Sequence, residues 1–171
     1  TFLQFVSLER AASELDLRNE AARMQQSGAL TIEEVATLDF AALTHFWQSE
    51  LGLNLRRHPE KAVQREMPFT ARMSAGDFRE LELPLANPGL GDNEFVVVQG
   101  VVDLAVIQPR EIWLLDFKTD GVSAAELPER KKQYAPQLKL YALALSRIYN
   151  RPVTQCWLHF LALKETVQIE N

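Results

Sequence analysis

The sequence predicts an α/β fold with a helical N-terminal section. Apolar residues recur at helical spacing through much of the first third of the chain, residues 1–58. Two strongly apolar runs, 95–107 and 111–119, are separated by the turn residues Gln108-Pro109-Arg110 and predict a β-hairpin. An amphipathic stretch over 134–149 predicts a long helix after that hairpin. Helices placed before and after paired strands are typical of a mixed α/β core.

Length and composition limit the possible classes of protein. The 171 residues, 47% of them hydrophobic and 24% charged, fit one domain over 1–171 with a single substantial core. No apolar run approaches the roughly 20 residues that span a bilayer, so we expect a soluble, unexported protein with no membrane partner. A single cysteine, Cys156, makes the cytoplasm the expected compartment. The net charge of -5 argues against nucleic-acid affinity from bulk charge alone.

Helix-capping residues place the elements of the helical section. Thr31 and Glu34 have the spacing of a capping box. Asp39 is the expected cap of the next helix, whose apolar residues recur at three and four until Gly52, where we expect the helix to end.

The periodicity changes at residue 62, where the predicted catalytic α/β core, 62–171, begins. Alternation predicts a strand with Val63, Arg65, Met67 and Phe69 on one face and Glu66 on the other. Residues 84–93, PLANPGLGDN, read as a loop within the domain. A strand over 153–163 should follow the long helix, and residues 167–170 are expected to pair back on it.

The stretch LLDFKTD, 114–120, is unusual because a buried strand runs directly into charge. If Ile107 pairs with Ile112 in the hairpin, Asp103 lies opposite Asp116, about 5 Å away. Period-two alternation then places Lys118 on the same face. Two adjacent carboxylates are destabilising unless a proton or a cation lies between them, and Mg²⁺ prefers such oxygen ligands. The backbone carbonyl of Phe117 is a further candidate ligand.

A surface ion pair is the plain alternative, because an isolated Asp-x-Lys match is common by chance. The apolar strand before it and the second acid at a matching register favour a metal site instead. Glu66, within the segment REMPF, offers a third acid upstream. Together these features favour a metal-dependent phosphodiesterase site.

Four motifs, taken in order, resemble the PD-(D/E)xK nuclease domains of the RecB family, and in particular those of AddA-type helicase-nucleases. They are REMPF with Glu66, GVVD ending at Asp103, DFKTD from Asp116, and QLKLY from Gln137. The resemblance covers most of the chain and is weakest between about Ser7 and Ala62. It implies a restriction-endonuclease-like mixed β-sheet flanked by helices.

The resemblance also implies roles for single residues. Asp103 and Asp116 would hold Mg²⁺, for which Mn²⁺ or Ca²⁺ could substitute, Lys118 would be catalytic, and Glu66 would take a metal-ligating or supporting role. On the long helix, substrate-binding residues would line the site: Gln137, Tyr141 and Tyr134. The implied activity is hydrolysis of DNA phosphodiesters in bacterial double-strand break repair. The implied partners are single-stranded DNA, a helicase part of the same parent chain, and an AddB-like subunit.

One departure from the resembled family concerns a histidine on an early helix, which serves there as a metal ligand. That position would fall just before Thr1, and His45, His58 and His159 do not fit it. The sequence therefore reads as a fragment that begins after this ligand. No GxxxxGK[ST] phosphate loop occurs, so ATP hydrolysis is not expected of these residues.

Two other functions remain open from the sequence. The domain could be a catalytically silent module that keeps the nuclease fold for docking or for guiding DNA. Intact Asp116 and Lys118 argue against this, and the missing histidine argues for it. A Mg²⁺-dependent esterase acting on a small phosphate is the third possibility. If the nuclease interpretation holds, water activated by the metal would attack the phosphorus while Lys118 stabilises the developing charge.

Overall fold

The computed structural model describes residues 1–84, 91 and 94–170. Most of the predicted 84–93 loop, namely 85–90 and 92–93, lies outside the described residues. None of the helices in the described part of the chain has the length and apolar character needed to cross a membrane.

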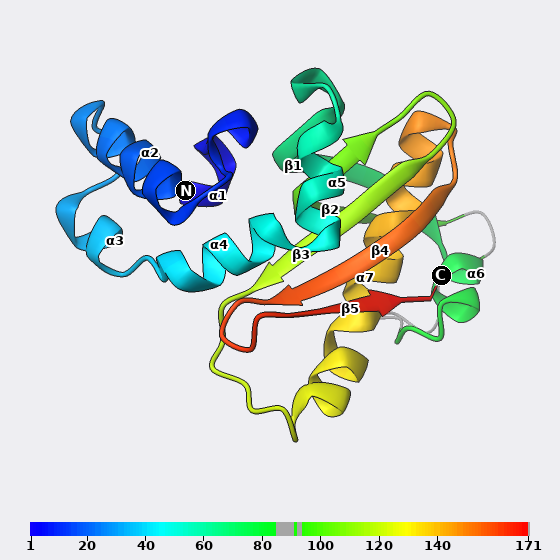
Figure 1. Ribbon diagram of the computed structural model, residues 1–171. Helices are drawn as coiled ribbons and strands as arrows, with labels where there is room; N and C mark the ends of the chain where they lie inside the picture. Colours follow the sequence, from blue (N-terminus) through cyan, green and yellow to red (C-terminus); the bar gives the residue numbers. More distant parts are fainter. Residues whose placement is uncertain (85–90, 92–93, 171) are drawn as a thin grey trace.

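A five-stranded mixed sheet with the order β1-β2-β3-β4-β5 forms the centre of the structure (Figure 1). Neighbouring strands are antiparallel except β3 and β4, which are parallel. The hairpin register is the predicted one, because Ile107 pairs with Ile112. Residues 165–169 pair back on β4, where the sequence predicts pairing over 167–170. The strands are β1 Val63–Ser74, β2 Phe95–Ile107, β3 Ile112–Lys118, β4 Val153–Phe160 and β5 Glu165–Ile169.

Helices cover both faces of this sheet (Figure 1), as the predicted fold class requires. The N-terminal helices share one core with Leu104, Val106 and Leu115, which we call the N-terminal core. Helix α7 shares the other with Ala105 and Leu114, the α7 core. The helices are α1 Phe2–Phe5, α2 Glu14–Gln26, α3 Ile32–Ala36, α4 Phe40–Gln48, α5 Glu50–Arg57, α6 Ala75–Glu80 and α7 Leu127–Tyr149, with 3-10 turns η1 Leu8–Arg10 and η2 Glu60–Ala62.

Two of the predicted helix boundaries are wrong. Gly52 does not end a helix; it lies inside α5, and the break falls at Ser49, which is both the C-cap of α4 and the N-cap of α5. A Cβ at Gly52 would lie 2.1 Å from the carbonyl oxygen of Phe46, so the glycine serves close packing of two helices. Helix α7 begins seven residues earlier than Tyr134, at Leu127, because Pro128 is favoured in a first turn.

Helix α6 was not anticipated, although it carries its own signal. Ser74 and Asp77 form a capping box, with the Asp77 backbone N–H donating to Oγ of Ser74. The predicted capping box of Thr31 and Glu34 and the cap at Asp39 are both present. Side-chain caps thus mark the starts of α3, α4 and α6 in the sequence.

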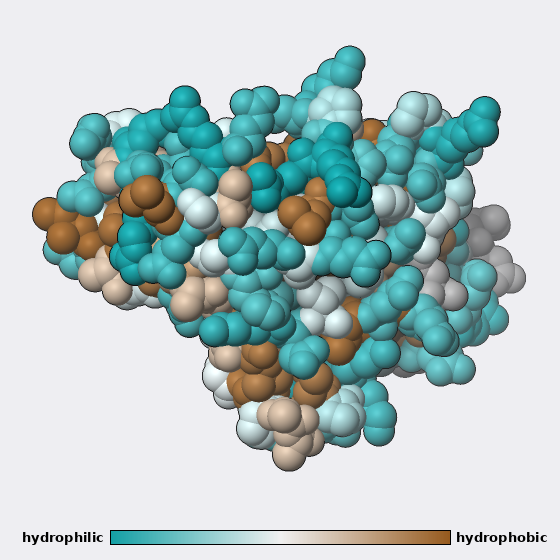
Figure 2. Space-filling view, in the orientation of Figure 1, coloured by the Kyte–Doolittle hydropathy of each residue, from teal (hydrophilic) through white to brown (hydrophobic). Residues whose placement is uncertain are grey.

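Side-chain to backbone hydrogen bonds attach the N-terminal segment to the rest of the chain. Arg65 of β1 donates to the carbonyl oxygen of Val6, and Nε of Arg56 donates to that of Leu8 at 3.1 Å. Figure 2 shows a mostly hydrophilic face with separate hydrophobic patches, one of them over the segment between β3 and α7. The bond from Arg65 ties Val6, and with it the start of the chain, to β1.

Candidate active site

A break in the pairing of β1 with β2 creates the candidate site. Pairs are regular on both sides of Glu66 and Asp103, but these two residues are skipped, and Glu66 has a φ of 48°. Val102 packs in the α7 core whereas Leu104 packs in the N-terminal core. Alternation therefore reverses at the kink. The predicted common face of Val63, Met67 and Phe69 is wrong for this reason, because Val63 belongs to the N-terminal core and Phe69 to the α7 core.

The β2–β3 register brings Asp103 to Asp116, as the hairpin interpretation predicts. Pairing runs from Ile107–Ile112 to Leu104–Leu115, and the next step along both strands reaches Asp103 and Asp116. Instead of a ladder pair, Oδ2 of Asp103 accepts a hydrogen bond from the backbone N–H of Phe117 at 2.7 Å. The Asp103 carboxylate is therefore fixed against the strand that carries the other two charged residues.

Asp116 and Lys118 form an ion pair at the end of β3. Nζ of Lys118 lies 2.6 Å from Oδ2 of Asp116, and the Lys118 side chain is 14% exposed. That oxygen is buried and accepts no well-directed hydrogen bond. Both residues follow Ile112 and Leu114 on the side of α7. A buried charge pair with an incompletely satisfied oxygen costs stability, which is typical of a site kept for function.

Electrostatic repulsion marks the convergence of the acids. Burial raises the pKa of Asp103 to about 6, with the negative charge of Asp116 as the next cause. The Phe117 N–H opposes this shift, Glu66 adds to it and Lys118 opposes it. The charges of Glu66, Asp116 and Lys118, the other side chains predicted to do chemistry, therefore all act on Asp103 at the kink.

A cavity opens from the kink toward the N-terminal helices. Glu66, Asp103 and Phe117 line it together with Thr1 and Phe2 of the N-terminal segment. Asp116 and Lys118 are not among its lining residues, so they lie behind Asp103 on the side of α7. The predicted single face for Asp103, Asp116 and Lys118 is thus divided by the kink into an open part and a buried part.

The donor set suits a hard cation, although it is not fully assembled. Among residues 1–84, 91 and 94–170, no group of three or more His, Cys, Asp or Glu side chains is arranged to hold a metal ion. The oxygens of Asp103 and Asp116 are nevertheless of the kind that Mg²⁺ prefers. A divalent ion would also offset the repulsion that raises the pKa of Asp103.

Gln137 and Tyr141 lie one turn apart on α7, as predicted. Nε2 of Gln137 donates to the hydroxyl of Tyr141 at 3.0 Å, and the Tyr141 ring packs edge-on against Phe69 of β1. A Cβ at Gly100 would lie 2.7 Å from the end of the Tyr141 side chain, so this glycine admits the tyrosine beside the sheet. Gln137 is exposed and thus available to a substrate.

Tyr134 contacts one of the charged residues directly. Its ring centroid is 4.1 Å from Nζ of Lys118, and its hydroxyl donates to Oδ2 of Asp120 at 3.0 Å. Asp120 was not singled out from the sequence, although it closes the DFKTD motif. Its position two residues after Lys118 was the signal that could have identified it.

The three histidines lie apart from the cavity, in agreement with the sequence interpretation. His45 is exposed on α4, and His58 packs edge-on against Trp113. His159 is buried against Phe46, where burial, followed by electrostatic interaction with His45, lowers its pKa to about 4. None of them lines the described cavity with Glu66 and Asp103.

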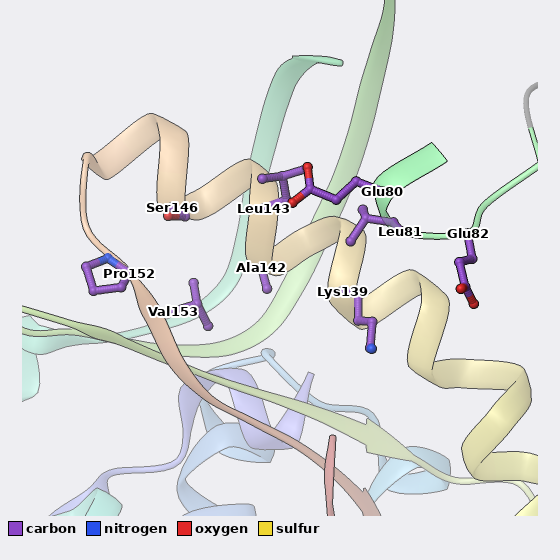
Figure 3. A pocket seen from close by; sticks show the side chains of 9 residues that line it. All are labelled: Glu80, Leu81, Glu82, Lys139, Ala142, Leu143, Ser146, Pro152 and Val153. Carbon is purple, nitrogen blue, oxygen red and sulfur yellow. The ribbon is translucent and has the colours of Figure 1, made fainter. Parts of the chain in front are cut away.

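A second cavity lies between α6, α7 and the start of β4 (Figure 3). Its polar lining comes from Glu80, Glu82, Lys139 and Ser146, and its apolar lining includes Leu143. Figure 3 shows that it contains none of the predicted site residues. The acidic cluster at the kink therefore remains the candidate active site.

Comparison with known proteins identifies a family for this arrangement. The model of the PD-(D/E)XK nuclease superfamily matches residues 4–169. An ATP-dependent helicase/nuclease subunit of Carboxydothermus hydrogenoformans is 31% identical over 168 residues, which cover 98% of this chain. Proteins of the same name from Clostridium botulinum and Bacillus cytotoxicus are 28% and 29% identical over 99% of it. The chain spans only 14%, 13% and 14%, respectively, of these relatives' lengths.

Proposed function

Because the chain belongs to the PD-(D/E)XK nuclease superfamily, we propose that it is the Mg²⁺-dependent DNA-cleaving domain of a helicase-nuclease. Residues 1–171 form this domain, and 62–171 carry its catalytic core. The observation that supports the proposal most strongly is that Glu66, Asp116 and Lys118 all lie close enough to influence the Asp103 carboxylate at one kink in the sheet. The reaction is hydrolysis of a DNA phosphodiester.

Asp103, Asp116 and the backbone carbonyl of Phe117 would hold the metal. A bound divalent ion lowers the pKa of a coordinated water and stabilises charge on a phosphoryl oxygen. The Phe117 N–H keeps one oxygen of Asp103 fixed while leaving the carboxylate at the wall of the cavity. Asp103 is therefore held for ligation before any metal arrives.

Lys118 supplies positive charge beside the reacting phosphate. Its ammonium group is held at the Asp116 carboxylate, 2.6 Å away, in a largely buried position. A fixed charge in such surroundings stabilises developing negative charge more than a mobile one in water does. Glu66, exposed at the kink, supports the metal or orients the water.

Gln137 and Tyr141 would contact the DNA strand from α7. Their mutual hydrogen bond fixes both side chains, so that little side-chain freedom is lost when a strand binds. The Tyr141 ring packs on Phe69, which leaves the amide of Gln137 as the more accessible contact. We assign binding of single-stranded DNA to these two residues.

The N-terminal segment completes the cavity. Thr1 and Phe2 line it together with Glu66 and Asp103. A histidine ligand directly before Thr1, at the position that the family resemblance implies, would lie next to these acids. Such a ligand would complete a set that the described residues do not assemble alone.

The wider role that we propose is supported by similarity to relatives that are named ATP-dependent helicase/nuclease subunits. We propose that a helicase part of the same parent chain feeds single-stranded DNA to this domain. We also propose that the parent protein pairs with an AddB-like subunit. It would act in the bacterial cytoplasm, in the repair of double-strand breaks. A helicase would supply the DNA affinity that a net charge of -5 does not.

Cleavage of single-stranded DNA with Mg²⁺ by the full-length protein, and by its Asp116→Ala variant, tests the proposal. We expect the substitution to lower the cleavage rate by about 100-fold or more, since it removes a metal ligand and the partner of Lys118. The surface variant Glu129→Ala is the control, because Glu129 is 82% exposed. Cleavage that survives Asp116→Ala would refute the site assignment, as would hydrolysis of a small phosphodiester in preference to DNA.

A catalytically silent module for docking or guiding DNA is the second candidate. The observation that favours it is that the described residues assemble no three-ligand metal cluster. Absence of cleavage in the full-length protein with Mg²⁺ and with Mn²⁺, together with retained DNA binding, would support this role.

A further inference from the structure

We propose that Tyr134 and Asp120 form a clamp that positions Lys118, and that Tyr134 therefore acts through the lysine and not on DNA. This inference refines the proposed nuclease function and rests on it for its kinetic part. It differs from the substrate-binding role that the sequence assigns to Tyr134.

The clamp consists of two contacts from one tyrosine. The ring centroid of Tyr134 lies 4.1 Å from Nζ of Lys118, within the range of a cation–π interaction. Its hydroxyl donates to Oδ2 of Asp120 at 3.0 Å. Because a phenol bound to a carboxylate is a charge-assisted donor, this bond anchors the far end of the Tyr134 side chain beside Asp120.

Lys118 is confined from two sides as a result. Asp116 attracts its ammonium group at 2.6 Å, and the Tyr134 ring covers it from the side of α7. The side chain is 14% exposed, so few other positions are open to Nζ. A lysine side chain with four methylene groups has many rotamers. Its ammonium group stays in one place only if the surroundings exclude most of them.

The clamp also joins two segments that are distant in the chain. Asp120 follows β3, whereas Tyr134 lies two turns into α7, and its ring also packs near Phe160 of β4 at 6.3 Å. The backbone N–H of Leu161 donates to the carbonyl oxygen of Lys118 at 3.0 Å. The lysine is thus held at both its backbone and its ammonium group.

Tyr134 differs in this respect from Tyr141, the other tyrosine assigned to the site. The hydroxyl of Tyr141 accepts from the exposed Gln137, so that pair faces a possible substrate. The hydroxyl of Tyr134 is committed to Asp120 and its ring face to Lys118. Because its hydroxyl and its ring face both have partners within the protein, Tyr134 is poorly placed to bind a DNA base or phosphate.

Chemical labelling of Lys118 tests the clamp without any need for cleavage. The full-length protein is acylated with an amine-selective reagent, and the labelling of Lys118 is followed by peptide mass spectrometry, with exposed Lys164 as the internal reference. We expect Tyr134→Leu to raise the relative labelling rate of Lys118 roughly fivefold, because the covering ring is lost. An unchanged rate in a folded variant would overturn the proposal.

Two conservative variants separate positioning from a general loss of structure. Tyr134→Phe keeps the ring, and Asp120→Ala removes the acceptor, so each should raise labelling by less than about twofold. Because they break the same bond, the double variant should match either single variant. Additive effects would show that Asp120 and Tyr134 do not act together.

Steady-state cleavage kinetics then distinguish a positioning role from DNA binding. Tyr134→Leu should lower kcat roughly tenfold with little change in KM, and should have no further effect when Lys118 is already methionine. Tyr149→Leu, on the same helix with its hydroxyl near Met67, should leave kcat unchanged. A raised KM with unchanged kcat would overturn the clamp and restore the substrate-binding role. If the wild-type protein does not cleave DNA, the nuclease proposal fails while the labelling result still decides the clamp.

Discussion

The two ends of the β1–β2 ribbon differ in how they are buried. The inner end, Val63–Arg65 with Leu104–Val106, lies between the N-terminal core and the α7 core. The outer end, Met67–Ser74 with Phe95–Val102, packs on the α7 core but leaves its other face open. There Phe95, Val97 and Val101 are 48%, 53% and 46% exposed.

The acids lie at the boundary between these ends. At the kink, Asp103 is buried enough for its pKa to rise, yet it still lines a cavity that a substrate can enter. A site deeper in the inner end would lack access, and one in the outer end would lose its electrostatic strength to water. One irregular step in a two-stranded ribbon can therefore bury a carboxylate partly and still leave it accessible to a substrate.

Truncation of an apolar side chain should have the largest effect and should differ between the two ends. Leu104→Ala, at 2% exposure in the inner end, should lower the free energy of unfolding by about 3 to 4 kcal/mol, because it leaves a cavity in the N-terminal core. Val97→Ala, in the outer end, should change it by less than about 0.5 kcal/mol. Urea titration measures both values. Equal losses of unfolding free energy in the two variants would show that the outer end is also covered in solution. The two ends would then not differ in burial.

Glycine substitutions compare the helical layers that accompany the two ends. Gly52→Ala in α5, next to the inner end, should cost about 2 to 3 kcal/mol, because the added Cβ meets the Phe46 carbonyl oxygen at 2.1 Å. Gly76→Ala in α6, beside the outer end, should stabilise by about 0.5 to 1 kcal/mol, since its Cβ meets only Oγ of Ser74 at 3.4 Å. Thermal unfolding provides the measurement. Unchanged stability of the Gly52→Ala variant would mean that α4 and α5 can move apart without loss of stability.

Strand pairing near the acids was predictable because hairpin register depends on local information. The Pro109 turn and the apolar runs on either side were enough to pair Ile107 with Ile112 and to direct Asp103 toward Asp116. The reversal at Glu66 was not predictable, since a positive φ at a glutamate leaves no mark in an alternation pattern. The division of the acids between an open and a buried side follows from that backbone conformation.

Contacts between distant segments were the other unpredictable part of the site. Helical spacing placed Gln137 and Tyr141 on one face correctly, because residues four apart on a helix are neighbours. The same spacing suggested that Tyr134 extends this face. Its contacts with Lys118 and Asp120 depend instead on how α7 lies across the sheet, which no local pattern encodes.

The smallest of these effects concerns the carboxylate at the boundary. The pKa of Asp103 is about 6 in the folded protein, above the value of about 4 expected in the unfolded chain. The folded state therefore binds this proton more tightly, and the resulting stability is fully present below pH 4 and lost as pH rises through 6. At pH 8, without metal, the ionised carboxylate should destabilise the protein by about 1 to 2 kcal/mol.

Asp103→Asn should remove this penalty while it removes the metal ligand. The amide oxygen can still accept from the Phe117 N–H, so the local geometry is kept. In the presence of a chelator, the variant should be more stable than the wild type at pH 8 and equal to it near pH 4. His159, whose pKa is lowered, should give the opposite pH dependence of stability in both proteins. Its contribution cancels when the free energy of unfolding of the wild type is subtracted from that of the variant. If the difference in free energy of unfolding between the two proteins does not change with pH, Asp103 carries no repulsive charge. The kink would then not be a site that sacrifices stability for function.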